Sequence, residues 1–241
     1  MSEVQSVSQP LPTHPEPMAE RAPAKAYRGM AMEGSIARWY ARTRGTESQL
    51  SDWRAQAEAI TRDLPSGASV LEVAPGPGYF AVELARLGRL RVSALDISAT
   101  FVGIVRENAQ KAGVDVSVRQ GDASRMPYAD SSFDLIVCQA AFKNFSRPQA
   151  AVDEMFRVLR PRGIARIQDM HREASDEAIQ DEVDNMQLGF FRALMTRSAL
   201  RSLRRRAYTV DQFQQFVRAS PFREGSVEVS GIGLELLLRR P

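Results

Sequence analysis

The sequence of residues 69–87, SVLEVAPGPGYFAVELARL, joins two different apolar patterns at a tight turn. An apolar run at 70–73 breaks at APGPG, residues 74–78, and after this break apolar residues recur at helical spacing. The pattern predicts a strand, a glycine turn and a helix. Gly76 and Gly78 leave no side chain between the main chain and a ligand, and the first amides of the helix are free donors. We therefore expect a cofactor to bind at this turn.

Strands and helices alternate on both sides of this turn. Apolar runs predict strands at 70–73, 91–96, 115–119, 133–138 and 163–169, and two short runs at 226–230 and 234–238 predict a terminal hairpin. Helical spacing predicts helices at 48–64, 79–87, 99–112 and 148–159. Because the strands are largely apolar and alternate with helices, we expect an α/β fold with a mostly parallel sheet covered on both faces.

The remaining segments divide the chain into a tail and one domain. Residues 1–26 contain five prolines and few large apolar side chains, so we expect a disordered tail. Residues 27–241 are expected to form a single domain, in which residues 27–47 act as an N-terminal cap. Residues 175–219 are helical in pattern and interrupt the alternation where a further strand would arrive. We interpret them as a helical insertion or lid.

The composition excludes several classes of protein. The single cysteine, Cys138, has no intramolecular partner, which removes a disulfide framework and a cysteine-rich metal site and favours a reducing, cytoplasmic compartment. No metal site is expected. The formal net charge of +3 is a weak argument for nucleic acid, so no nucleic-acid partner is expected. No apolar run approaches the ~18 residues of a membrane span, and nothing in the sequence indicates the oligomeric state.

Three carboxylates narrow the choice of cofactor. Asp96 ends the second strand at about the ~20-residue distance from Gly76 that is typical of an acid that binds ribose hydroxyls. Glu72 ends the first strand, where it would repel a pyrophosphate but can pair with an ammonium group. Asp122 follows the third strand and can accept from an adenine amino group. This set favours a cofactor with adenosine and an amino acid, and a nicotinamide-dependent oxidoreductase is the less favoured alternative.

Four motifs resemble those of the class I S-adenosylmethionine-dependent methyltransferases, in the branch similar to the ubiquinone/menaquinone methyltransferases. The resemblance extends over residues 70–169, and its motifs are LEVAPGPGYFAVELA, ALDIS, QGDASRMPYADSSFDLIVCQAAFKNF and EMFRVLRPRG. It implies a Rossmann-like sheet of seven strands with an antiparallel C-terminal hairpin. It also implies transfer of a methyl group from S-adenosyl-L-methionine to an oxygen, nitrogen or carbon nucleophile of a small-molecule acceptor. A module that binds this cofactor without methyl transfer is the alternative.

The resemblance also implies the residues of the cofactor site. Glu72 and the glycine loop would hold the methionine part, Asp96 the ribose, and Asp122 the adenine. The full predicted set is Glu72, Ala74, Gly76, Gly78, Asp96, Ile97, Asp122, Ala123 and Gln139. Two departures from the family pattern stand out. Ala74 replaces the usual first glycine, and RPRG, residues 160–163, has arginine where a glycine is common before the fifth strand.

The catalytic and acceptor-binding residues are less well defined by the sequence. A base is optional in methyl transfer, and His171, Asp169 and Tyr27 are the candidates to take a proton from the acceptor. For His171, an ordinary surface histidine is the competing interpretation. Lys143 and Asn144 follow the fourth strand, where many such enzymes place acceptor-facing residues. Basic residues at helical spacing in the insertion form either a solvated face or a site for an anionic substrate or partner, namely Arg197, Arg201, Arg204 and Arg205.

Overall fold

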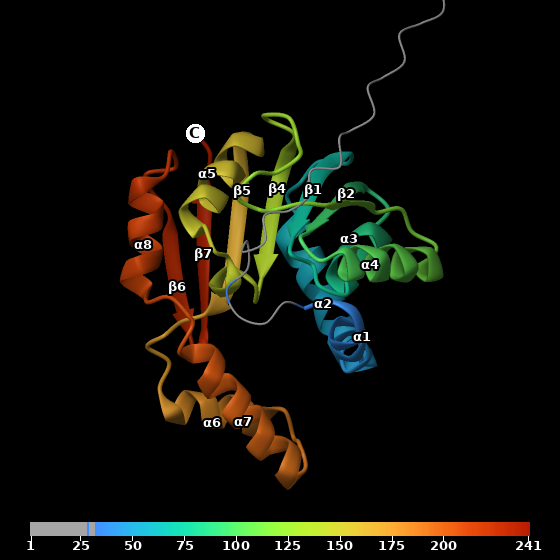
Figure 1. Ribbon diagram of the computed structural model, residues 1–241. Helices are drawn as coiled ribbons and strands as arrows, with labels where there is room; N and C mark the ends of the chain where they lie inside the picture. The colour runs from blue at the N-terminus through green and yellow to red at the C-terminus, as the bar shows by residue number, and fades with distance from the viewer. Residues whose placement is uncertain (1–27, 29–31) are drawn as a thin grey trace, which may run out of the picture.

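The computed structural model describes Arg28 and residues 32–241, and these residues contain a seven-stranded sheet (Figure 1). The predicted tail, residues 1–26, and Tyr27 lie outside the described residues. The strands follow the order β3-β2-β1-β4-β5-β7-β6. Their bounds are β1 Ala68–Val73, β2 Leu90–Asp96, β3 Ser117–Gln120, β4 Phe133–Gln139, β5 Leu159–Met170, β6 Ser226–Ser230 and β7 Gly233–Arg239.

The direction of the strands confirms the predicted mostly parallel sheet. Strands β1 to β5 pair with one another only in parallel, whereas β7 runs antiparallel to both β5 and β6. The chain leaves β1 toward β2 and β3 on one side, and β4 and β5 continue the sheet on the other side. The strand order therefore reverses between β1 and β4, which is where ligands bind in open sheets of this kind.

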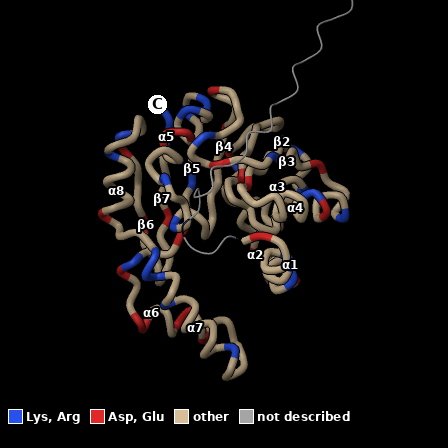
Figure 2. Tube along the Cα trace, viewed as in Figure 1, with Lys and Arg blue, Asp and Glu red and all other residues tan. Residues whose placement is uncertain are grey.

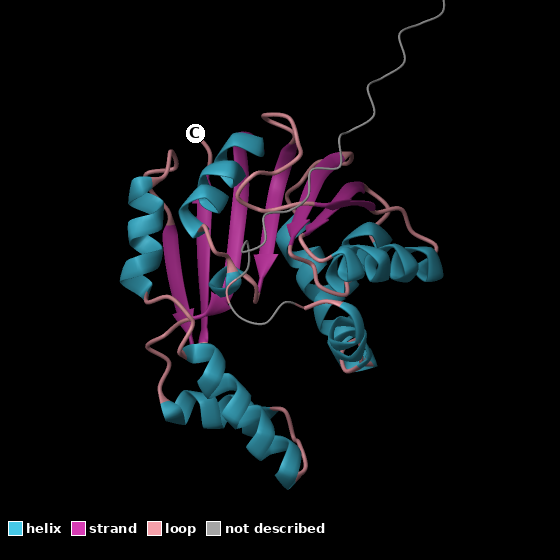
Figure 3. Cartoon of the chain, viewed as in Figure 1, coloured by secondary structure: helices cyan, strands magenta, loops and turns pink. Residues whose placement is uncertain are grey.

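Helices cover both faces of the sheet, as predicted (Figure 3). Val70 of β1 packs into a core with α2, α3 and α4, whereas its neighbour Leu71 packs into a second core with α5 and α8. This alternation follows from the two-residue period of a strand. The helices are α1 Gly34–Arg42, α2 Glu47–Thr61, α3 Tyr79–Arg86, α4 Ala99–Ala112, α5 Pro148–Val158, α6 Asp176–Asn185, α7 Phe190–Arg204 and α8 Val210–Ala219, with a short 3₁₀ helix η1 at Phe142–Asn144.

The start of β5 differs from the prediction. The strand begins at Leu159, four residues before the predicted start, and its pairing with β4 shifts between Phe133 and Leu135. Within this irregular part Arg162 adopts a left-handed backbone, with φ at +65°, and its amide donates to the carbonyl of Arg240 at 2.9 Å. Helix α5 consequently ends at Val158. Pairing with distant segments therefore sets this boundary, which local patterns do not reveal.

The predicted insertion, residues 175–219, has two structurally different parts. Helix α8 covers the sheet, because Phe213 and Val217 lie in the core beside α5. Helices α6 and α7 instead project beyond the end of the sheet (Figure 3). At the start of α7, Phe190 and Phe191 are 79% and 80% exposed. Among Arg28 and residues 32–241, no helix combines the length and apolar content that a membrane crossing needs.

Candidate cofactor and acceptor site

A pocket of about 720 Å³ lies at the carboxyl ends of β1, β2 and β4, beside the reversal of strand order. Its volume is within the ~300–1,000 Å³ that ligand pockets commonly have. The loop after β1 forms one wall, the loops after β2 and β3 form the next, and η1 with the end of α7 closes the other end. Of the predicted cofactor residues, those that line the pocket are Ala74, Gly76, Asp96, Ile97, Asp122, Ala123 and Gln139.

The loop after β1 is held by left-handed backbone at three positions. The φ angles are +56° at Ala74, +55° at Gly76 and +75° at Gly78. A Cβ at Gly78 would come within 2.7 Å of the Val105 methyl groups, whereas a Cβ at Gly76 would meet nothing within 4 Å. Gly78 is therefore required for packing against α4 as well as for its backbone angle, and Gly76 only for its angle. Ala74 takes the glycine conformation at some energetic cost.

Glu72 lies behind the loop and does not line the pocket. It shares the face of β1 with Val70, beneath α3, and accepts a hydrogen bond from the amide of Ala81 near the start of that helix. Its Oε2 atom is buried without a hydrogen-bond partner among the residues that the structure describes. Burial raises the pKa of Glu72 to about 8, although the hydrogen bond from Ala81 lowers it, and the charge of Asp96 adds to the rise. Its predicted contact with the methionine part stays a prediction.

Asp96 connects the end of β2 to the glycine loop and lines the pocket. Its Oδ2 accepts from the amide of Gly76 at 3.2 Å, and its Oδ1 accepts from the amide of Ser98 at 2.8 Å. Burial raises the pKa of this carboxyl to about 7, although these hydrogen bonds oppose the rise. A carboxylate in this position can accept hydrogen bonds from vicinal hydroxyl groups, which is the chemistry predicted for a ribose.

Asp122 and Gln139 reach the same pocket from β3 and β4. The Oδ1 atom of Asp122 accepts from the amide and hydroxyl of Ser124, and its Oδ2 atom lies 2.9 Å from a guanidinium nitrogen of Arg147. The side-chain amide of Gln139 donates to Gln56 at 2.9 Å. Both side chains are therefore oriented by neighbouring groups. The predicted residues that line the pocket are up to 65 positions apart in the sequence, from Ala74 to Gln139.

Two of the predicted catalytic residues, Asp169 and His171, do not line this pocket. The carboxylate of Asp169 is buried and accepts from Lys143 Nζ at 2.7 Å and from the amides of Lys143 and Met170. The His171 Nε2 atom lies 3.1 Å from the carbonyl of Gly231, in the turn between β6 and β7. The third candidate, Tyr27, lies outside the described residues. The proposed base roles stay predictions, and this geometry gives no support to His171 or Asp169.

Several pocket residues were not predicted from the sequence. They are Met32, Glu33, Tyr40, Arg44, Phe101, Arg147, Leu203 and Arg206, among others. Glu33 accepts from the amides of Ala99 and Thr100 at the start of α4, at 3.0 and 3.2 Å. Burial raises its pKa, but hydrogen bonds led by that from the Thr100 hydroxyl more than offset this effect and hold the pKa below its usual value. Only the packing of α1 on α4 brings Glu33 here, so no local sequence pattern could have identified it.

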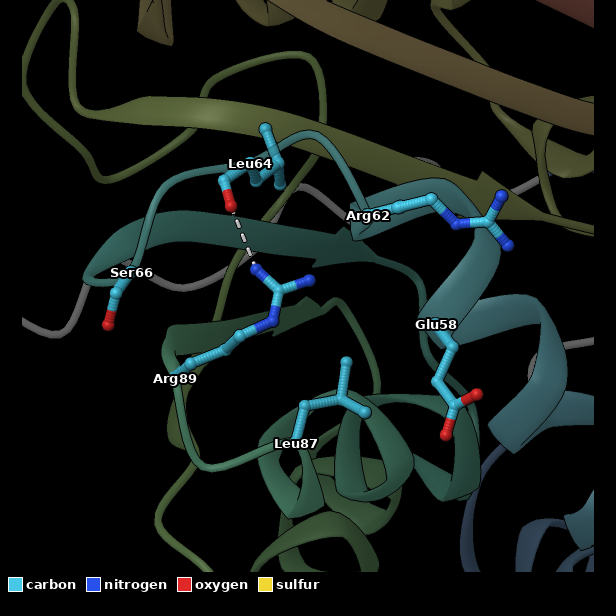
Figure 4. Close-up of a pocket in the computed structure, with 6 residues that line it drawn as sticks. All are labelled: Glu58, Arg62, Leu64, Ser66, Leu87 and Arg89. Atoms are coloured by element: carbon cyan, nitrogen blue, oxygen red, sulfur yellow. Dashed lines mark hydrogen bonds between the residues drawn. The ribbon is translucent and has the colours of Figure 1, made fainter.

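A second hollow, of about 450 Å³, lies at the opposite edge of the sheet (Figure 4). Leu64 and Ser66 precede β1, and Leu87 and Arg89 precede β2, so this hollow is at the amino ends of the strands. The Arg89 guanidinium donates to the carbonyl of Leu64 at 2.9 Å, which ties the two loops together. The hollow contains none of the predicted site residues, and the pocket at the carboxyl ends is the candidate site.

Comparisons with known proteins concern the family and the fold of the chain. Residues 71–167 match a family described as Methyltransferase domain. A demethylmenaquinone methyltransferase of Deinococcus radiodurans is 37% identical over 114 residues, which is 46% of each chain. A ubiquinone/menaquinone biosynthesis C-methyltransferase UbiE of Roseobacter denitrificans is 35% identical over 101 residues, 41% of this chain and 40% of that protein. The matches thus span less than half the length of these two relatives.

A solved structure extends the comparison to most of the chain. A SAM-dependent methyltransferase from Aquifex aeolicus superposes with a TM-score of 0.60 at 19% identity, over 82% of this chain and all of that one, and this likeness concerns the fold. Residues 71–167 therefore match a methyltransferase domain, and the chain shares its fold with that SAM-dependent methyltransferase. In sequence the domain is similar to the demethylmenaquinone and ubiquinone/menaquinone methyltransferases named above. The predicted fold is confirmed, and the family match agrees with the predicted class.

Proposed function

We propose that the protein transfers the methyl group of S-adenosylmethionine to a nucleophilic atom of a small-molecule acceptor. The observation that carries this proposal is the meeting of the glycine loop, Asp96 and Asp122 in one pocket at the carboxyl edge of the sheet. These groups offer backbone amides and two separate carboxylates, which suits a cofactor with an amino acid, a ribose and an adenine. The family match on residues 71–167 supports the same assignment.

Residues of three loops would bind the three parts of the cofactor. The turn at residues 74–78 would hold the methionine part, Asp96 the ribose hydroxyls, and Asp122 with Ala123 the adenine. The cofactor supplies an activated methyl group on a sulfonium centre. The protein then needs to orient the acceptor nucleophile in line with the sulfur–carbon bond and to exclude water. Asp96 is held by Gly76 and Ser98, so it is oriented before a ligand arrives.

The acceptor would occupy the end of the pocket next to η1 and α7. Asn144, Phe145 and Ser146 line this end from one side, and Leu203 lines it from the other. Lys143 also lines it, and its ion pair with Asp169 fixes the backbone after β4. An aromatic, quinone-type acceptor fits the apolar side chains Phe145 and Leu203. The relatives named as demethylmenaquinone and ubiquinone/menaquinone methyltransferases favour the same chemical class.

Calorimetry with S-adenosylhomocysteine and with NADH tests the cofactor assignment. We expect S-adenosylhomocysteine to bind and NADH not to bind at comparable concentration. Asp96→Asn should weaken S-adenosylhomocysteine by about tenfold or more, because a charged hydrogen-bond acceptor is lost. Asp153→Asn is a matched control, since Asp153 lies on α5 and does not line the pocket. A preference for NADH, or equal affinities in the two variants, would refute the assignment.

Methyl transfer itself requires a separate assay. The protein is incubated with S-adenosylmethionine labelled in its methyl group and a panel of hydroxylated naphthalenes, quinols and hydroxylated aromatic acids, and labelled product is measured. Transfer to at least one acceptor is expected. Binding of the cofactor without transfer to any member of a broad acceptor panel would instead favour a binding module.

A further inference from the structure

Most of the charged side chains that line the pocket have a hydrogen-bond, ion-pair or cation–π partner in the described part of the chain. Each of the three acidic residues in its lining receives hydrogen bonds. Glu33 accepts from the start of α4, Asp96 from Gly76 and Ser98, and Asp122 from Ser124 and Arg147. The acidic side chains of the lining are therefore already bound by groups of the protein.

Three of the four basic residues in the lining also have partners. Lys143 pairs with Asp169 at 2.7 Å and Arg147 pairs with Asp122 at 2.9 Å. The guanidinium carbon of Arg44 lies 5.2 Å from the centre of the Tyr40 ring, in a cation–π contact. Arg206 differs from these residues. Its side chain makes no ion pair or hydrogen bond with any residue of the described part of the chain, and it lines the pocket.

The position of Arg206 is fixed by its neighbours in the chain. Basic positions gather where the insertion joins the body of the molecule (Figure 2). Arg204 pairs there with Asp176 at 3.0 Å, and Arg205 is exposed and does not line the pocket. The next residues, Ala207 and Tyr208, are buried. The buried residues anchor the backbone beside Arg206, so its guanidinium belongs to the pocket wall and not to the projecting helices.

Arg206 lies at the end of the pocket that the proposed function assigns to the acceptor. Leu203, one helical turn earlier, lines the same pocket, as do Phe145 and Ser146. The Phe142 ring of η1 lies 5.8 Å from the Tyr208 ring and 5.4 Å from the Phe145 ring, which places the segment after Arg206 beside η1. The amide of Arg206 donates to the carbonyl of Leu203 at 2.9 Å, which closes this last turn. This end of the pocket therefore combines apolar side chains with a guanidinium that lacks an acidic partner in the described structure.

We propose that the acceptor carries a carboxylate that Arg206 binds, while the apolar part of the acceptor lies against Phe145 and Leu203. A guanidinium suits this role because its planar donors match the two oxygens of a carboxylate. The inference rests on the proposed function, and it narrows the acceptor to an aromatic acid. Arg206 is a specificity residue in this arrangement and takes no part in the transfer of the methyl group.

Binding of matched acids and esters tests this inference. The probes are hydroxybenzoates and hydroxynaphthoates, each compared with its methyl ester, which keeps the ring and removes the charge. Calorimetric titrations use the full chain, with and without S-adenosylhomocysteine, as wild type, Arg206→Gln, Arg206→Lys and Arg205→Gln. Arg205→Gln is the matched control, because it removes the same charge from the adjacent residue outside the pocket.

The wild type should bind the best acid at least tenfold more tightly than its ester. Arg206→Gln should lose about tenfold or more of the affinity for the acid and keep that for the ester within about twofold. Arg206→Lys should restore part of the loss, and Arg205→Gln should behave as the wild type. Failure of the wild type to bind any acid, equal binding of acid and ester, or equal losses in Arg205→Gln and Arg206→Gln would overturn the inference. Failure of S-adenosylhomocysteine to bind would contradict the proposed function alone, because the acid–ester comparison is also made without it.

Discussion

Replacement of Ala74 by glycine should stabilise the protein. Ala74 has φ at +56°, and a left-handed backbone costs a residue with a Cβ about 1–2 kcal/mol. Glycine removes this cost but adds about 0.4–1 kcal/mol of entropy to the unfolded chain. The difference predicts that Ala74→Gly raises the free energy of unfolding by about 0.5–1 kcal/mol. The hydrogen bond from the Ala74 amide to the Leu95 carbonyl, at 2.7 Å, uses only backbone atoms and remains.

The reverse substitution at the neighbouring glycines should show the same energy with the opposite sign. Gly76 has φ at +55°, and a Cβ added there would meet no atom within 4 Å. Gly76→Ala should therefore lower the free energy of unfolding by about 0.5–1 kcal/mol through backbone conformation alone. Gly78→Ala should cost clearly more, since its Cβ would also lie 2.7 Å from Val105. Gly103→Ala is the control, because Gly103 lies inside α4 in open space, and alanine should there stabilise by about 0.5–1 kcal/mol.

Urea unfolding monitored by circular dichroism measures these differences, and thermal melts should shift by about 2–4 °C per kcal/mol for a chain of this size. The reasoning predicts that Ala74→Gly and Gly103→Ala stabilise, that Gly76→Ala destabilises, and that Gly78→Ala destabilises most. A neutral or destabilising Ala74→Gly, or equal costs at Gly76 and Gly78, would refute it. The first result would mean that the loop does not strain Ala74, and the second that Val105 moves away freely.

Three further predictions concern the buried charges. The folded-state pKa of Glu72, about 8, lies above its ordinary value of 4.5, so its contribution to stability is present below about pH 4.5 and is lost as the pH rises to about 8. In urea unfolding, Glu72→Gln should therefore have a free energy of unfolding a few kcal/mol above that of the wild type at pH 8.5 and almost the same at pH 4. An equal difference at both pH values would contradict this prediction. The carboxyl of Asp96 has a pKa of about 7, and hydrogen bonds from ribose hydroxyls would lower it, so Asp96 should release protons when the cofactor binds at pH 7. The measured heat of S-adenosylhomocysteine binding should therefore depend on the ionisation enthalpy of the buffer. A heat that is the same in all buffers would contradict this prediction. Lys143→Met leaves Asp169 buried without its ion pair and should lower the free energy of unfolding by about 3–5 kcal/mol. The double variant Lys143→Met/Asp169→Asn should recover part of this loss, because it also removes the buried charge. Equal losses in the single and double variants would argue against the charge as the cause.

The sequence alone was sufficient to predict the alternation of strands and helices and the turn after β1. Both depend on local periodicity and on the conformational freedom of glycine, which neighbouring residues express directly. It also predicted that Asp96 and Asp122 lie at one edge of the sheet, where the carboxyl ends of parallel strands meet, and both residues line the pocket there. The early start of β5 escaped prediction, since Arg162 reaches a left-handed backbone through its contact with Arg240, far along the chain.

Only the tertiary structure decided the rest of the site. Glu72 ends the first strand as predicted, but the face of β1 on which it lies places its carboxyl beneath α3 and not in the pocket wall. His171 follows β5 near the ligand edge, yet its ring is next to Gly231 in the turn between β6 and β7. Glu33 and Arg206 reach the pocket from segments far apart in the chain, through the packing of α1 on α4 and, after α7, the pairing of Tyr208 with His171 just beyond β5. Contacts between segments so distant in sequence have no local pattern, which is why the sequence indicated a cap and an insertion but not which of their residues line the pocket.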